Sequence, residues 1–218
     1  REARAVLVGG ATLITYGCDA SRWQGLLDWR ALRRKGIEFA ALRATMGLSG
    51  LDPLYSAQRS AAEAAGVLVI SYGLIYPRPG TGAAQAQHLV RTSGAKAGSI
   101  LALDVEPPDG EPPALAAVWR EVVYDAACET SKLCAFPPLI YGSPSFLRAL
   151  DLPYDMWGAP LWIADWRARL LPEVPLPWKR ATIRQTGLAP SSISAMPLDY
   201  DRFEGTLDEL RDAASWRA

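Results

Sequence analysis

Histidine, cysteine and net charge are all scarce in this sequence. His88 is the one histidine and three cysteines occur, so a zinc site has almost no ligands to draw on. Lysine plus arginine and aspartate plus glutamate both number 23, and this balance gives no reason to expect nucleic acid or an anionic membrane as a partner. We therefore expect no metal site. We also expect a monomer without a cofactor.

Disulfides and membrane spans also have little support. An odd number of cysteines argues against a disulfide framework, although Cys128 and Cys134 would close a short loop in an oxidising compartment. The apolar stretch Ala5–Ile14 is interrupted by two glycines and is too short to span a bilayer. We interpret residues 1–12 as an N-terminal arm, with the remnant of a targeting segment as the alternative, and residues 13–218 as one domain.

The segment Ser99–Pro108 carries the most informative pattern. Ile100 to Val105 is an apolar run without helical spacing, typical of a strand buried on both faces, and the prolines that follow must end it. Asp104 and Glu106 point to the same face of this strand, roughly 6–7 Å apart along the chain. In a β/α barrel, active sites form at the carboxyl ends of the strands. The alternative is a strand end whose acids meet water.

The rest of the chain alternates strands with helices, which indicates a parallel sheet. The other expected strands are Leu13–Cys18, Ile37–Arg43, Val67–Tyr72, Pro138–Tyr141, Leu161–Ala164, Ala181–Gln185 and Met196–Tyr200. The expected helices are Asp28–Lys35, Pro53–Ala65 capped by Asp52, Ala83–Ser93, Ala114–Glu129, a short helix from Ser143 to Leu150, and Leu207–Trp216. No helix separates the last three strands. The predicted fold is therefore α/β, a single-domain irregular TIM-like barrel, (β/α)5(β)3.

In such a barrel, acids from distant segments share one cleft. Asp19, Asp104, Glu106 and Asp199 all lie at expected carboxyl-terminal strand ends. Four acids at equivalent positions in three segments are hard to explain as surface residues. We expect them to form one acidic site.

Several motifs occur in a fixed order along nearly the whole chain. They are Tyr16-Gly17-Cys18-Asp19-Ala20-Ser21 with Trp23-Gln24-Gly25 and Asp28-Trp29, Phe39–Ala44, Ala65-Gly66 through Tyr72, Leu101–Glu106, Leu139–Tyr141, Leu161–Ala164 and Leu198–Gly205. Together they resemble glycoside hydrolase family 25, the Chalaropsis-type lysozymes, which include many phage endolysins. The order and spacing of the motifs carry this resemblance more than any single one.

The resemblance implies an N-acetylmuramidase that cleaves the β-1,4 bond between N-acetylmuramic acid and N-acetylglucosamine, with residues 13–218 as its catalytic domain. It implies Glu106 as the catalytic acid and Asp104, Asp19 and Asp199 as partner carboxylates. Its partner would be the glycan strands of peptidoglycan. It would act outside the cell at the wall, or, as a phage endolysin, pass from the host cytoplasm to the periplasm and wall.

These residue types suit glycoside cleavage, which needs a proton donor and negative charge near an oxocarbenium-like centre. Like charges around Glu106 favour its protonated form. Asp104 lies too close to Glu106 to act as an inverting base across the sugar. We expect it to orient the substrate's own 2-acetamido group, with net retention; covalent and inverting routes are the alternatives.

Side chains near the other strand ends are expected to line a sugar groove. They are Tyr72, Tyr141, Trp162, Asp165, Trp166, Gln185 and Arg43. Arg43 is also a candidate to hold one of the acids, and Asp165 adds a fifth acid. Ordinary core packing is the alternative for Trp162 and the preferred interpretation for Trp23, Trp29 and Cys18, while His88 is expected to face solvent. Where the family commonly has Tyr-His-Phe, this chain has Tyr72-Gly73-Leu74, so substrate preference there stays open.

Two other functions are compatible with the residues. One is a carbohydrate-binding barrel without turnover, which the presence of all four acids argues against. The other is a metal-dependent phosphodiesterase, in which clustered carboxylates hold a divalent ion. Such enzymes usually also use histidines, and His88 is badly placed for that role.

Overall fold

Eight strands close into a barrel in the computed structural model, which describes residues 13–107, 116–153, 156, 158–167 and 172–214. The barrel strands are β1 (Ile14–Ala20), β2 (Ile37–Met46), β4 (Leu68–Leu74), β5 (Leu101–Asp104), β6 (Leu139–Gly142), β7 (Leu161–Ala164), β8 (Ile183–Leu188) and β9 (Asp199–Glu204). Pairing of β1 with β2 closes the ring, and the short β3 (Gly50–Leu51) extends β2 as a hairpin.

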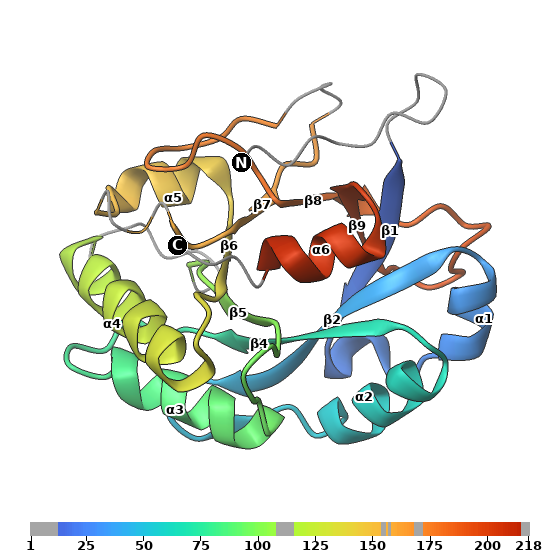
Figure 1. Cartoon of the computed structure of the whole chain (residues 1–218), viewed down its shortest axis with the longest axis horizontal. Coiled ribbons are helices and arrows are strands. Elements are labelled where there is room, and N and C mark those ends of the chain that lie inside the picture. Colours follow the sequence, from blue (N-terminus) through green and yellow to red (C-terminus); the bar gives the residue numbers. More distant parts are fainter. Residues whose placement is uncertain (1–12, 108–115, 154–155, 157, 168–171, 215–218) are drawn as a thin grey trace.

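A helix follows each of the first five barrel strands or its hairpin. These helices are α1 (Trp29–Arg34), α2 (Tyr55–Ala64), α3 (Gly82–Ser93), α4 (Ala116–Cys134) and α5 (Pro144–Leu150). Figure 1 shows them around the outside of the barrel. The described residues between β7, β8 and β9 contain no α-helix. This confirms the predicted (β/α)5(β)3 fold.

Successive side chains of each strand point alternately into and out of the barrel, and this produces two apolar layers. One fills the barrel interior, where Phe39, Ile70 and Leu139 pack together. The other lies between the barrel and its helices and includes Cys18 and Trp29, both buried as predicted. The interior layer fills the barrel beneath the strand ends, where a site can form.

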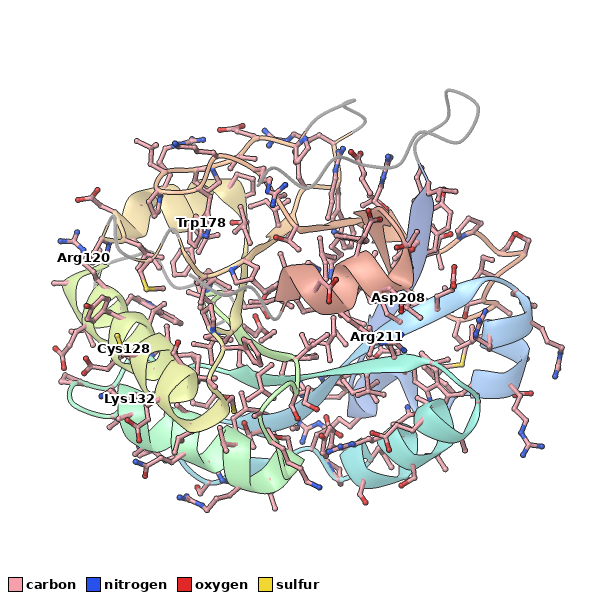
Figure 2. All side chains as sticks on the ribbon, in the orientation of Figure 1. Arg120, Cys128, Lys132, Trp178, Asp208 and Arg211 are labelled. Carbon is pink, nitrogen blue, oxygen red and sulfur yellow. The ribbon has the colours of Figure 1, made fainter. Side chains whose placement is uncertain are left out.

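The last helix, α6 (Leu207–Ala214), covers one end of the barrel. Its Leu210 is fully buried in the interior cluster beside Ile100, which precedes β5. Figures 1 and 2 look onto this end, and Asp208 and Arg211 form an ion pair on the helix, with 2.7 Å between Oδ1 and Nη1. The carboxyl ends of the parallel strands therefore open at the opposite end.

Strand β9 runs antiparallel to both of its neighbours, whereas the other barrel strands are parallel. The prediction that Asp199 lies at the carboxyl end of a strand was therefore wrong, because Asp199 begins β9. In the β1–β9 register, Asp199 pairs with Asp19. The reversed direction brings the amino end of β9 to the carboxyl end of β1, so Asp199 still reaches the acidic end of the barrel.

The predicted start of α2 was also wrong. Asp52 was expected to cap a helix beginning at Pro53, but α2 begins at Tyr55. The Asp52 carboxylate instead accepts hydrogen bonds from Arg43 Nε at 3.0 Å and from the backbone N–H of Arg22 at 2.9 Å. Asp52 thus ties the β2–β3 hairpin to the turn after β1.

Cys128 and Cys134 do not form a disulfide, and all three cysteines are free. Both lie in α4, where Figure 2 labels Cys128. Six residues of helix separate them by about 9 Å along the axis and place them on different sides. A disulfide needs Cα atoms within about 7 Å of each other, so the helix excludes the short disulfide-closed loop that the sequence left open.

Three predictions concern residues outside the described part of the chain: the arm at residues 1–12, the first two residues of the helix expected at 114–129, and the end of the helix expected to reach residue 216. Within the described ranges, no helix is both long and apolar enough to cross a membrane.

Candidate active site

In the part of the chain that the structure describes, five carboxyl groups gather at the end of the barrel away from α6. Asp19 lies near the end of β1, Asp104 ends β5, Glu106 follows two residues later, and Asp199 and Asp201 belong to β9. Asp19 feels the charges of Asp199 and Glu106, and Asp104 feels those of Glu106 and Asp19. The predicted convergence of Asp19, Asp104, Glu106 and Asp199 agrees with these interactions.

Gln185 donates a hydrogen bond to Asp19 and is itself held by two further donors. Gln185 Nε2 donates to Asp19 Oδ2 at 2.7 Å. The other end of the same amide, Oε1, accepts from Tyr141 Oη at 3.1 Å and from Trp166 Nε1 at 2.8 Å, so the amide cannot turn its N–H away from Asp19 without losing both donors. Burial and the nearby Asp199 raise the pKa of Asp19 to about 7.

Asp104, the last residue of β5, and Glu106, which follows the strand, differ in exposure. The Asp104 side chain is buried, and its Oδ1 has no hydrogen-bond partner among the described residues, whereas Glu106 is exposed. Burial and the charge of Glu106 raise the pKa of Asp104 well above its usual range, and Arg43 partly opposes this. The arrangement leaves one buried acceptor next to one accessible acid.

The sequence interpretation missed Asp201 as a member of this cluster. Its side chain is fully buried, and Trp162 Nε1 donates to Oδ1 at 2.8 Å. Burial and the charge of Asp19 raise its pKa well above the usual range. Strand alternation was the available signal, because Asp201 must face the same side as Asp199.

Aromatic rings form the floor under the acids. The Trp162 ring centroid lies 4.5 Å from that of Tyr141 and 6.2 Å from that of Tyr72. Trp162 is only 2% exposed, so it packs in the barrel and supports the site, as the core alternative predicted. Burial raises the pKa of Tyr72 and Tyr141, which keeps both hydroxyls neutral.

The prediction for Asp165 needs refinement. Its carboxylate accepts from Arg167 Nε at 2.6 Å and from the backbone N–H of Glu173 at 3.0 Å. Burial alone would raise the pKa of Asp165, but the hydrogen bonds and charge of Arg167 lower it overall. Asp165 is therefore an ion-paired anchor for the loop after β7, beside the acidic cluster.

A cavity of about 490 Å³ lies next to the acids. Its lining includes Gln185, which donates to Asp19, and Tyr141, which donates to Gln185. Trp166, 55% exposed, forms part of its wall, together with Arg148 and Asp165. A cavity of about 570 Å³ also exists, but it lies at the opposite end of the barrel, near α6, and is remote from the carboxyl cluster. The smaller one is the continuation of the candidate site.

Three other side chains make contacts that the sequence did not predict. Arg43 forms its ion pair with Asp52, although its charge also lowers the pKa of Asp104, and its Nη2 is buried without a partner among the described residues. Trp23 is 71% exposed, so its predicted core position was wrong; it sits in a short 3-10 turn with the Arg22 guanidinium over its ring. His88 is half-buried, with Nε2 3.0 Å from the backbone oxygen of Gly50, and does not simply face solvent.

Comparison with known proteins identifies the family. The model of the Glycosyl hydrolases family 25 matches residues 18–185, which is most of the chain. The chain belongs to this family. Membership classes this protein as a glycoside hydrolase, and three of the four predicted acids lie inside the matched range.

Individual relatives agree with the family 25 assignment. Lysozyme M1 from Streptomyces globisporus is 33% identical over 78 residues, which are 36% of this chain and 26% of that protein. A bacterial lysozyme from Streptomyces coelicolor superposes with a TM-score of 0.83 at 24% identity, covering 92% of this chain and 97% of the other. The family GH25 lysozyme from Aspergillus fumigatus gives 0.84 at 23%, covering 94% and 100%. The two structures establish the fold.

The raised pKa of Asp19 predicts that its ionised carboxylate lowers the stability of this family 25 protein. A carboxyl whose folded pKa is raised stabilises the fold below the unfolded value near 3.8, and that contribution is lost as the pH rises to about 7. At pH 8 the free energy of unfolding of Asp19→Asn should therefore exceed that of wild type by about 1–2 kcal/mol. The gain is smaller than the full pKa shift implies, because Asp19 is partly exposed to solvent.

Thermal unfolding followed between pH 4 and pH 8 tests this expectation. The advantage of Asp19→Asn should shrink as the pH falls to 4, where the wild-type carboxyl is protonated in the folded state and close to half protonated in the unfolded chain. Asp151→Asn is the matched control, since Asp151 is exposed at the end of α5. A wild type as stable as Asp19→Asn at pH 8 would contradict the prediction.

Proposed function

We propose that this protein is an N-acetylmuramidase that cleaves the β-1,4 bond between N-acetylmuramic acid and N-acetylglucosamine in peptidoglycan. One observation carries the proposal: a buried carboxyl with an unpartnered oxygen, Asp104, lies close enough to an accessible acid, Glu106, to feel its charge. Family 25 membership supports the reaction class.

The two acids divide the chemistry between them. Because the charge of Glu106 disfavours ionisation of Asp104, the pair favours one shared proton, and in the free protein burial places it on Asp104. A bound sugar brings an acetamido N–H to the unpartnered oxygen of Asp104, and a hydrogen bond to the ionised form lowers the pKa of that carboxyl. The proton then resides on Glu106, which donates it to the glycosidic oxygen as general acid.

Hydrolysis is proposed to proceed through the substrate's own acetamido group. Asp104 orients this group so that its oxygen attacks the anomeric carbon as the leaving oxygen departs with the proton of Glu106. Glu106 then removes a proton from water, which opens the cyclic intermediate and gives net retention. Asp19 and Asp199 supply negative charge close to the oxocarbenium-like centre.

The neighbouring cavity suits a glycan chain. Trp166 offers an exposed ring face, and amphipathic rings of this kind cover apolar sugar faces while their N–H finds a partner, here Gln185. We propose that Tyr141, Trp166 and Gln185 contact the sugars, with Tyr72 and Trp162 beneath them. The protein would then act at the cell wall as a secreted enzyme or a phage endolysin.

Mass analysis of muropeptides after digestion of purified peptidoglycan tests the function. A muramidase leaves a new reducing end on muramic acid, which borohydride reduction marks. A reducing end on N-acetylglucosamine, or a released peptide, would contradict the proposal, and the absence of any product would favour a binding barrel. Activity that persists with a chelator separates this reaction from that of a metal-dependent phosphodiesterase.

A further inference from the structure

Asp201 is a buried carboxyl without a part in the reaction above. It lies within β9, opposite Gly17 of β1 and Gln185 of β8, and its side chain is fully buried. An ionised carboxylate so placed is costly unless each oxygen is satisfied. Trp162 satisfies Oδ1, while Oδ2 has no donor among the described residues.

A proton on Asp201 removes this difficulty. Two carboxylates accept hydrogen bonds but cannot donate, so an ionised Asp201 cannot bond to Asp19. When Asp201 is protonated, its contact with Asp19 becomes a hydrogen bond. Asp19 then has two donors, Gln185 Nε2 and the Asp201 hydroxyl.

The charges around Asp201 favour its neutral form. The titratable groups near it come from several elements: Asp19 and Cys18 from β1, Asp199 from β9 and Tyr141 from β6, with Asp104, Glu106 and the cationic Arg43 farther into the cluster. The nearest of these are acidic. Burial acts in the same direction, and both raise the pKa of Asp201, while the Trp162 hydrogen bond opposes them.

We propose that Asp201 is a positioning residue, a neutral carboxylic acid whose hydroxyl donates to Asp19 and holds that group as an anion aimed at the cleft. The proposal deepens the muramidase function and rests on it. Asp201 does not touch the sugar in this scheme. It acts through Asp19, in the way that a second hydrogen-bond partner orients a ligand-binding side chain.

Two substitutions separate this role from simple packing. Asp201→Asn keeps an N–H for Asp19 and an oxygen for Trp162, whereas Asp201→Leu removes both. In Asp201→Leu the lost donor raises the pKa of Asp19, so the acidic limb of the pH–activity profile should move up by about one unit and activity at pH 6 should fall about tenfold below that of Asp201→Asn. A merely structural role would lower activity equally at every pH.

A measurement on the unaltered protein covers the case in which Asp201→Leu fails to fold. Carbon-13 NMR of labelled aspartate carboxyls should show the Asp201 carbon in its protonated form from pH 5 to pH 8. Titration of that carbon near pH 4, or an Asp201→Asn variant as impaired and as pH-shifted as Asp201→Leu, would overturn the proposal. If wild type releases no muropeptides, the proposed function fails, while the NMR titration still decides whether Asp201 is neutral.

Discussion

Glu106→Gln is expected to lower kcat on peptidoglycan about a thousandfold, since glutamine keeps the shape of the side chain but has no proton to give. Glu106 is exposed, so the substitution should leave the unfolding temperature within about 1 °C of wild type. Release of muropeptides, timed by chromatography against the wild-type enzyme, measures the effect.

The control for this substitution lies at the other end of the barrel. Glu63→Gln in α2 removes an exposed carboxyl that pairs with Arg59 at 2.7 Å, far from the acids of the cleft. It should digest peptidoglycan at the wild-type rate. Equal rates for Glu106→Gln and wild type would show that the proton comes from another group.

Asp104→Asn should lower kcat about 10²–10³-fold and change KM little. The amide oxygen can still accept the acetamido N–H, but it lacks the negative charge that stabilises the cyclic cation as it forms, and loss of one such interaction has this magnitude. Because the neutral amide also replaces a buried acid, the unfolding temperature of the variant near pH 7 should be at least as high as that of wild type.

The stereochemistry of the product gives an independent check on Asp104. Proton NMR of the first product, recorded before the anomers equilibrate, should show the β-anomer. A thiazoline analogue of the cyclic intermediate should bind wild type more tightly than Asp104→Asn. An α-anomer as the first product would replace the assisted route by an inverting one, even if the substitution abolished activity.

The β5 segment shows why much of the site could be predicted. An apolar run that ends in two acids and two prolines has one reading as a buried strand, and alternation then places Asp104 and Glu106 on one face. The observed strand, Leu101–Asp104, and the burial of Asp104 agree with the predicted buried strand, while Glu106 lies two residues beyond its end and is exposed. Local pattern was sufficient because each constraint acts within ten residues.

Strand direction and pairing across the barrel could not be read in the same way. Periodicity is identical in parallel and antiparallel strands, so nothing in residues 196–204 revealed that Asp199 begins its strand. The Arg43–Asp52 pair depends on the β2–β3 hairpin folding back. Trp23 was assigned by hydrophobicity alone, which does not register that its 3-10 turn stands clear of the core.

The reversed direction of β9 places one carboxyl of the site directly after a loop that can be exchanged. Asp104 ends the strand that positions it and Glu106 follows that strand. Asp199 is instead preceded by the hairpin segment 189–198, which is exposed at residues 190–192 and 195–197 and buried at Leu198. Within that segment Ala189 N–H donates to the Leu198 oxygen at 2.8 Å, and Lys35 Nζ donates to the Ile193 oxygen at 2.9 Å. Grafting alternative loops between Ala189 and Leu198 would vary the approach to a single carboxyl while the barrel wall stays intact.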